Sequence, residues 1–151
     1  MLGRDYPKQN CSIARALELF GDRWSLLILR DALFRGFSRY GEFQQSLDIA
    51  TNVLAERLAR FVREGVFDCD DGAYLPTQKA RDVAPALIAL TQWGDTWAAP
   101  EGAPIIYRTE AGVDLHISIR DRRGRTVVPS ATIVARPGPG HRRAVAPDPP
   151  E

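Results

Sequence analysis

Hydrophobic residues in the first half of the chain recur at helical spacing. From Ser12 to about Phe20, apolar side chains stand three and four residues apart, which predicts a helix with one buried face. The segment from Arg23 to about Phe34 is apolar on most sides, so it is predicted to be the central, buried helix, with Asp22 as its cap. The buried stripe of the first helix is predicted to consist of Ile13, Ala16, Leu17 and Phe20.

Two shorter helices and a hairpin are predicted next. Residues 40–47 and 51–64 have helical apolar spacing, and a tight turn at residues 48–50 separates them. Residues 66–69 and 73–75 flank Asp70-Asp71-Gly72, and an Asp-Gly pair between apolar runs is a strong hairpin signal. The inner face of the second of these helices is predicted to be Leu54, Leu58, Phe61 and Val62.

A fifth helix is predicted from Thr77 toward Trp97, with a kink or break at Pro85. One side of this helix is predicted to carry Val83, Leu87, Leu90, Thr91 and Gly94, with Trp93 and Trp97 beside them. Beyond it the composition shifts to a Pro/Gly/Ala linker, then to strand-like segments at residues 105–107, 113–119 and 126–134. Residues 136–151 are rich in Pro and Gly and are predicted to be disordered.

These elements predict a mainly α chain with a small β-wing (α+β): a winged helix-turn-helix with a C-terminal β-hairpin-like extension. We assign residues 1–104 to this winged helix-turn-helix domain, 105–135 to the extension and 136–151 to a disordered tail. A 151-residue chain with 44% hydrophobic and 26% charged residues suits one globular domain. It has no apolar run of membrane-spanning length and no signal-peptide pattern, so we expect a cytoplasmic protein without a membrane partner.

Charge and candidate chemistry narrow the function. The net charge is +1, but Arg120 to Arg143 contains seven arginines and one aspartate, a local charge of +6. This basic tail could contact phosphates or merely keep the end of the chain in solution. The two cysteines and two histidines have no metal-ligand spacing, and the chain has no Ser-His-Asp set, P-loop or HExxH. We therefore predict neither an enzyme nor a cofactor or metal.

The helix predicted at residues 51–64 has the two faces that a DNA-reading helix needs, because the second helix of a helix-turn-helix enters the major groove. Asn can pair with adenine, Arg with guanine, and Glu can accept from cytosine. The alternative is an ordinary solvated face in which Glu56 pairs with Arg60. The predicted base-reading face consists of Thr51, Asn52, Ala55, Glu56 and Arg60. Arg39 and Tyr40 are predicted to hold flanking phosphates, and Arg57 is a candidate for a phosphate contact or an ion pair.

Three stretches of the chain resemble the HxlR-type winged-helix transcriptional regulators, relatives of the MarR group. They are CSIARALELFGDRWSLLILRD (11–31), ATNVLAERLARFVREGVF (50–67) and ALIALTQWGDTW (86–97). The resemblance covers about residues 7–104. It implies a homodimer built largely from the first and last helices, which binds double-stranded DNA and controls a neighbouring gene. A repressor acting on an inverted repeat is the expected form.

The predicted wing is acidic, because it contains Asp68, Asp70 and Asp71 and no basic residue. An acidic wing lies poorly against phosphate, which leaves a second hypothesis open: a winged helix that binds a protein partner and not specific DNA. An electrophoretic mobility shift with the DNA upstream of the gene distinguishes the two hypotheses. Only a DNA-binding regulator should give a shift that depends on salt and sequence.

Cys11, Trp93 and Trp97 are candidate effector residues. Cys11 stands at a helix start, where the helix dipole lowers a thiol pKa, and the resemblance implies that redox-sensing members use a cysteine there. The alternative is an inert small residue. Trp93 and Trp97 stand four residues apart and could line a ligand pocket, but packing in the dimer interface is the favoured interpretation.

Overall fold

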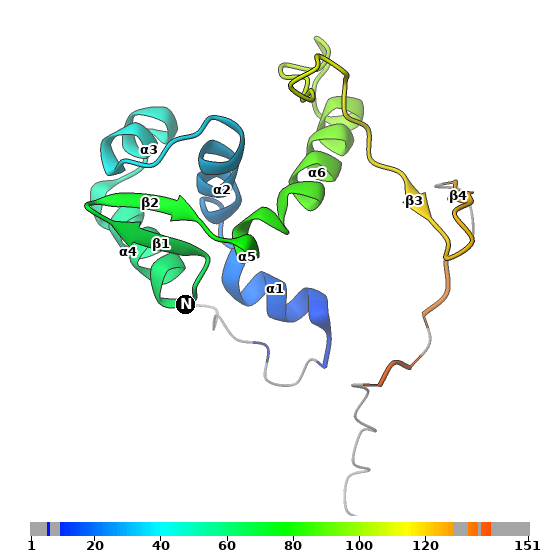
Figure 1. The fold of residues 1–151 in the computed structure, drawn as a ribbon, viewed down its shortest axis with the longest axis horizontal. Coiled ribbons are helices and arrows are strands. Elements are labelled where there is room, and N and C mark those ends of the chain that lie inside the picture. The colour runs from blue at the N-terminus through cyan, green and yellow to red at the C-terminus, as the bar shows by residue number, and fades with distance from the viewer. Residues whose placement is uncertain (1–5, 7–9, 129–132, 136, 140–151) are drawn as a thin grey trace, which may run out of the picture. The chain divides into compact units, whose positions relative to one another are not determined.

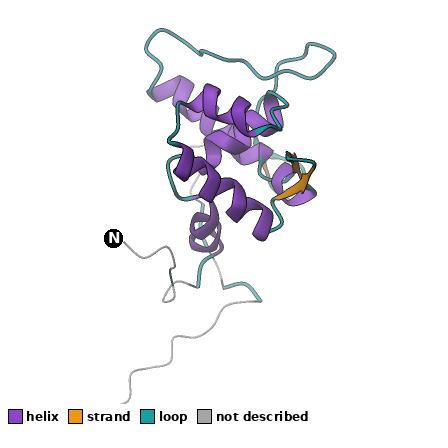
Figure 2. Ribbon diagram, turned by 90° about the vertical axis from the view of Figure 1, so that its left-hand side faces the viewer, coloured by secondary structure: helices purple, strands orange, loops and turns teal. Residues whose placement is uncertain are grey.

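The computed structural model describes residues 6, 10–128, 133–135 and 137–139 (Figure 1). It contains α1 (Ser12–Phe20), α2 (Ser25–Phe34), α3 (Tyr40–Leu47), α4 (Thr51–Arg63), β1 (Phe67–Asp70), β2 (Ala73–Pro76), α5 (Gln78–Arg81), α6 (Ala84–Trp97), β3 (Ile119–Arg120) and β4 (Thr126–Val127). Residues 21–118 form one compact unit, and the chain before and after them belongs to a second. Helices supply most of the regular structure (Figure 2).

The α+β fold class predicted from the sequence is confirmed, and local chemistry explains its boundaries. Asp48 adopts a left-handed φ of 48° at the end of α3, so the chain turns sharply into α4. Asp71 and Gly72 have φ values of 45° and 70°, the two positive angles of the two-residue turn that suits a hairpin. β1 pairs antiparallel with β2 across this turn, with Asp70 opposite Ala73.

The long helix predicted after the wing is broken, as expected, although the break precedes Pro85. α5 ends at Arg81, and α6 begins at Ala84 with Pro85 in its first turn. A proline fits there because the first backbone N–H groups of a helix have no partner within it.

The hydrophobic core of the larger unit lies between α2, α3, α4 and β1. Ile28 and Leu29 of α2 are fully buried, as are Leu54 and Leu58 of α4. Three phenylalanines join the other elements: Phe67 of β1 lies 5.2 Å from Phe61 of α4 and 6.5 Å from Phe43 of α3, centroid to centroid. The central position predicted for α2 is confirmed, because it contacts α3, α5, α6 and β2.

Asp31 is a fully buried carboxylate within the otherwise apolar α2. Its Oδ1 lies 2.8 Å from the Arg30 guanidinium and 3.6 Å from Arg35. Its Oδ2 accepts a hydrogen bond of 2.7 Å from the Ser46 hydroxyl of α3, which in turn accepts one from Arg35. A buried charge is tolerated only when it is paired and hydrogen-bonded, and here the pairing ties α2 to α3.

The predicted burial of the apolar stripe on α1 is wrong, and α6 also leaves an apolar side chain open to solvent. In α1, Ile13 is 70% exposed and Leu17 45%, and only Ala14 is buried. In α6, Leu87 and Ile88 are buried, whereas Leu90 is 54% exposed. Helical spacing identifies an apolar face but not what covers it, and in a single chain these two faces meet solvent.

The extension after α6 has fewer strands than predicted. Residues 105–107 and 113–118 form no strand, and the bridge between Arg108 and Asp114 is flanked by backbone hydrogen bonds across the turn between these segments. Instead of a strand, the side chain of Gln92 in α6 pairs with this segment: its oxygen accepts from the Ile117 N–H at 3.1 Å. The return strand is the short β4, paired with β3, and part of the predicted residues 126–134 and most of 136–151 lie outside the described residues.

Candidate nucleic-acid interface

α3, the turn at residues 48–50 and α4 form the helix-turn-helix. The carboxylate of Glu42 caps the start of α3 by accepting hydrogen bonds of 2.8 Å from the backbone N–H groups of Ser38 and Arg39. These N–H groups lower the pKa of Glu42, because they stabilise its charged form. The cap therefore fixes the entry of the chain into the helix pair.

α4 has two distinct faces. Leu54, Leu58 and Phe61 are fully buried against the core, as the apolar spacing predicted. The opposite face is polar or small and open to solvent, and Arg60 beside it is partly exposed. The exposed residues of this face are Thr51, Asn52, Ala55, Glu56, Ala59 and Arg63. These small and amide side chains allow the first two turns of α4 to approach base edges closely.

Arg57 is an ion-paired residue, one of the two alternatives left open by the sequence. Its side chain is only 11% exposed, and its Nε lies 2.9 Å from Oδ2 of Asp22. A second nitrogen lies 3.1 Å from the Glu56 carboxylate. Arg57 therefore holds α4 against the start of α2, and little of its guanidinium is left to meet a phosphate.

Asp22 caps α2 and binds α4 with the same carboxylate. Oδ1 accepts from the backbone N–H groups of Trp24 and Ser25, and Oδ2 accepts from the Ser25 hydroxyl at 2.6 Å. Burial alone raises the pKa of this group, but the Ser25 and Trp24 hydrogen bonds and the Arg57 charge outweigh it and lower the pKa below its usual value. The charged form of Asp22 is therefore the one that the fold stabilises.

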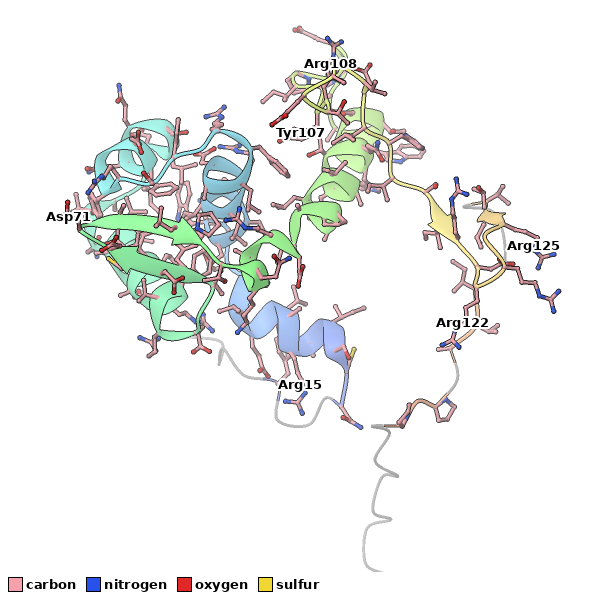
Figure 3. All side chains as sticks on the ribbon, viewed as in Figure 1. Arg15, Asp71, Tyr107, Arg108, Arg122 and Arg125 are labelled. Atoms are coloured by element: carbon pink, nitrogen blue, oxygen red, sulfur yellow. The ribbon has the colours of Figure 1, made fainter. Side chains whose placement is uncertain are left out.

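Arg39 and Tyr40 join the helix pair to the wing. The Arg39 guanidinium donates to the backbone carbonyl of Asp71 at the wing tip (labelled in Figure 3), and residue 39 bridges Ala73 of β2. The Tyr40 hydroxyl donates to the Thr51 carbonyl at 2.7 Å, so its hydrogen is already used within the protein. Arg39 remains exposed and supplies a positive charge beside the acidic wing.

The wing itself is acidic on its open surface. Asp68, Asp70 and Asp71 are all exposed, in agreement with the sequence. Beyond α6, Arg122 and Arg125 flank the β3–β4 turn (Figure 3), and Arg125 is paired with Asp121 at 2.8 Å. Among the described residues, α4 therefore carries arginines and Arg39 directly precedes α3, whereas the wing, β1 and β2 with their turn, carries no basic residue.

The two cysteines lie in different environments, and both are exposed and free. Cys11 directly precedes α1, and backbone N–H groups of Ala14 and Ile13 lower the pKa of its thiol. Cys69 lies on β1 of the wing.

No group of three or more His, Cys, Asp or Glu side chains suited to a metal occurs in the part of the chain that the structure describes. In the same part, no helix is long and apolar enough to cross a bilayer.

Trp93 and Trp97 of α6 are 63% and 74% exposed, and with Leu90 they form an apolar face on this helix. Exposure of this extent is unusual for tryptophan, because each ring buries a large apolar area when it is covered.

The sequence identified Trp93 and Trp97 as candidate residues, but it did not identify Asp31 and Gln92. The signal for Asp31 was a lone acid inside an apolar helix, whereas nothing in the sequence distinguishes Gln92.

The ion pair between Asp22 and Arg57 predicts a pH-dependent stability. A carboxyl group whose pKa is lowered by folding adds stability above its unfolded pKa of about 4, and this is lost as the pH falls through the folded value. Asp22→Asn keeps a capping oxygen but removes the charge, so it should cost about 1 kcal/mol at pH 7 and less at pH 3. Urea unfolding at both pH values measures this. Asp68→Asn, on the exposed wing, is the control, and an Asp22→Asn deficit that is equal at both pH values would contradict the interpretation.

Similar proteins agree with this geometry. The HxlR-like helix-turn-helix family model matches residues 19–102. An uncharacterised HTH-type transcriptional regulator of Mycobacterium tuberculosis (strain ATCC 25618 / H37Rv) is 35% identical over 144 residues, which cover 89% of this chain and 90% of the relative. The relatives are named as regulators and not as enzymes.

Two solved structures share the fold. The crystal structure of PA1607, a candidate transcription factor, has a TM-score of 0.75 and 35% identity, and the match covers 86% of this chain and 97% of that one. Quinone-bound YodB from Bacillus subtilis has a TM-score of 0.51 and 26% identity, and the match covers 61% of this chain and 99% of that one. The chain belongs to the HxlR-like helix-turn-helix family, and it is a transcriptional regulator with a helix-turn-helix DNA-binding domain.

Proposed function

We propose that this regulator is a bacterial, cytoplasmic homodimer that represses a neighbouring gene by binding an inverted-repeat operator. The supporting observation is the two-faced α4, whose exposed face starts with Thr51 and Asn52 while Arg57 fastens its other side to Asp22. A rigidly held helix can present its side chains to base edges in a fixed register. A dimer seated on the operator excludes other proteins from the same DNA, and this favours repression.

The reading surface is the exposed face of α4. Asn52 is the candidate for an adenine, Arg60 for a guanine and Glu56 for a cytosine, while Thr51 and Ala55 allow close approach. Arg39 is the candidate for a flanking phosphate. Tyr40 acts mainly by holding the start of α4, since its hydroxyl donates to Thr51.

The dimer uses apolar faces that a single chain leaves open. Leu90, Trp93 and Trp97 on α6 and Ile13 and Leu17 on α1 are the exposed apolar side chains of these helices. Covering two tryptophans and their neighbours supplies the apolar core that a stable interface needs. Two-fold symmetry then presents two α4 helices to successive major grooves about 34 Å apart.

An oxidant is the proposed signal, and Cys11 its receiver. The thiol of Cys11 is exposed and its pKa is lowered by the helix start, and a thiolate is the reactive form of cysteine. The structural neighbour YodB was solved bound to a quinone. Cys11 directly precedes α1, so its chemical modification would disturb the apolar face of α1 that we assign to the dimer interface.

A mobility shift with the DNA upstream of the gene tests the central proposal. We expect a shift that is specific for sequence and weakens with salt, because phosphate contacts release counterions. A shift that is equal for unrelated DNA, or no shift at all, would favour the alternative of a winged helix that binds a protein partner.

Substitution of Arg60 tests the reading surface. Arg60→Ala should weaken operator binding by about 1–3 kcal/mol and relax the preference at one base pair, because a bidentate contact to guanine is lost. Binding to single-base variants of the operator measures this, with Arg81→Ala on α5 as the control. A loss that is equal for all variants would assign Arg60 to a phosphate.

Substitution of Trp93 tests the dimer. Trp93→Glu should shift the protein toward monomer, because a charge would be buried in the interface. Sedimentation velocity over a concentration series measures this. The matched control is Leu75→Glu on β2, where another exposed apolar side chain lies outside the proposed interface. Equal behaviour of the two variants would remove α6 from the interface.

Substitution of Cys11 tests the signal. Peroxide or a quinone should reduce operator binding by the wild-type protein, and Cys11→Ser should bind equally well with and without oxidant, since serine has no reactive thiolate. Cys69→Ser is the control and should respond as the wild type does. Oxidant sensitivity that persists in Cys11→Ser would end the sensor hypothesis.

A further inference from the structure

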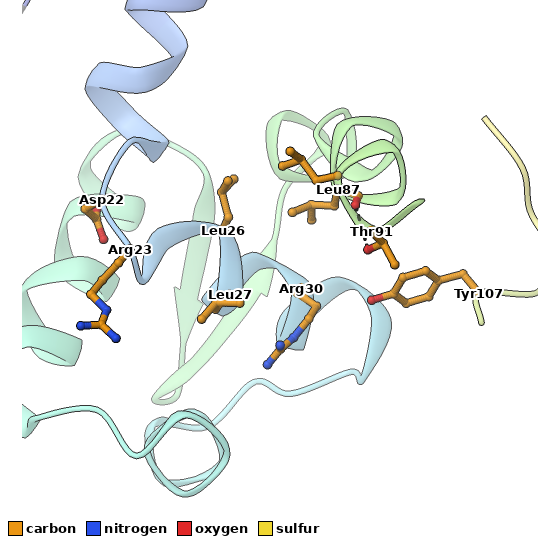
Figure 4. Close-up of a pocket in the computed structure, with 9 residues that line it drawn as sticks. Asp22, Arg23, Leu26, Leu27, Arg30, Leu87, Thr91 and Tyr107 are labelled. Carbon is orange, nitrogen blue, oxygen red and sulfur yellow. Dashed lines mark hydrogen bonds between the residues drawn. The ribbon is translucent and has the colours of Figure 1, made fainter. Parts of the chain in front are cut away.

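A hollow of about 440 Å³ lies between α2 and α6 (Figure 4). Four leucines form much of its wall: Leu26 and Leu27 from α2, and Leu87 and Leu90 from α6. This volume lies within the range of pockets that hold small organic molecules, which are typically apolar with a few polar groups at fixed places. Trp93 and Trp97 do not line it, so of the apolar face assigned to the dimer on α6 only Leu90 also borders the hollow.

Tyr107 closes one side of the hollow, with its hydroxyl pointing toward Thr91 (Figure 4). Its ring packs against Phe34 with centroids 4.5 Å apart, and its carbonyl accepts from the Leu115 N–H at 2.8 Å. Gln92 fastens the same segment to α6 through Ile117. Tyr107 lies beyond residues 19–102, so this wall is added to the region that the family model matches.

The hydroxyl of Tyr107 has no hydrogen-bond partner among the described residues. Thr91 donates its own hydroxyl hydrogen to the Leu87 carbonyl at 3.0 Å, which leaves the Thr91 oxygen as an acceptor facing the hollow. A ligand can therefore accept from Tyr107 or donate to Thr91 without displacing a bond of the fold.

The charged residues that line the hollow favour an anion. They are Arg23, Arg30 and Asp22. Asp22 is already paired with Arg57, and Arg30 with Asp31. The Arg23 guanidinium lies 4.8 Å above the Trp24 ring and has no carboxylate partner in the described part of the chain. Arg23 is thus the cation that remains to be neutralised.

We propose that this hollow binds a small, largely apolar carboxylate, whose hydrocarbon part lies between the leucines and whose charge meets Arg23. The bound molecule acts on DNA binding through Asp22, which lines the hollow and also holds Arg57 of α4 at 2.9 Å. The proposed effect of the ligand on DNA binding rests on the proposed function. The proposed binding of the ligand rests on the pocket alone.

Calorimetric titration of the full chain with 1-naphthoate, and with neutral 1-naphthamide as a matched probe, tests binding. We expect naphthoate to bind about tenfold more tightly than the amide, as a charge-assisted hydrogen bond allows. Arg23→Gln should remove this preference, whereas Arg81→Gln on α5 should keep it. Equal binding of both probes, or a preference that survives Arg23→Gln, overturns the proposal.

A space-filling substitution tests the location. Leu27→Trp should reduce the affinity for both probes about tenfold or more, because the indole occupies the hollow, while Leu75→Trp on the wing should not. Circular dichroism verifies that each variant is folded. If Leu27→Trp does not fold, the comparison of the two probes with Arg23→Gln alone tests the proposal. Undiminished binding by folded Leu27→Trp places the probe elsewhere and overturns the proposal.

The coupling to α4 is measured with and without DNA. Naphthoate at saturation should shift the NMR signal of the Arg57 Nε–H, and it should change operator affinity severalfold in the wild type but not in Arg23→Gln. An unmoved Arg57 signal overturns the proposed effect of the ligand on DNA binding even if the protein binds no specific DNA. A shifted signal without any operator binding would instead contradict the proposed function and leave the pocket established.

Discussion

One carboxylate near each end of α2 fixes the positions of α3 and α4, the two helices of the helix-turn-helix. Asp22, just before the helix, caps it and holds Arg57 of α4 at 2.9 Å. Asp31, near its end, is fully buried and accepts from Ser46 of α3. Apolar packing alone allows helices to slide and rotate, whereas a paired, desolvated charge has one satisfactory geometry. Each helix of the pair is therefore attached by polar contacts to α2 or to Asp22, the residue that caps it.

The attachment of α4 also determines which of its side chains are exposed to solvent. Because Arg57 turns inward to Asp22 and Leu54 and Leu58 fill the core, the first two turns expose Asn52, Ala55 and Glu56 together. Tyr40 adds a third constraint by donating to the Thr51 carbonyl at the beginning of the helix. The proposed base-reading face is thus held from two sides by contacts within the protein.

Features set by neighbouring residues were predictable from the sequence, and features set by distant ones were not. The bounds of α3, the capping by Asp22 and the Asp71-Gly72 turn depend on backbone angles and local donors. The exposure of Ile13 and Leu90 depends on what covers a helix, which periodicity does not contain. The predicted strand at 113–119 failed for a similar reason: its hydrogen-bonding partner is largely the Gln92 side chain and not another strand. Arg57 could be assigned to an ion pair only when Asp22 was seen beside it.

The charge of the molecule bears on how it selects DNA. A net charge of +1 and an acidic wing supply little of the phosphate attraction that gives most regulators their nonspecific affinity. Arg39 offsets part of this, because its guanidinium covers the wing tip at Asp71 and adds a positive charge where the wing meets α3. With a weak nonspecific term, the proposed base contacts from α4 carry a larger share of the operator affinity that we propose. Discrimination depends on the ratio of specific to nonspecific binding, so an acidic wing is compatible with a selective regulator.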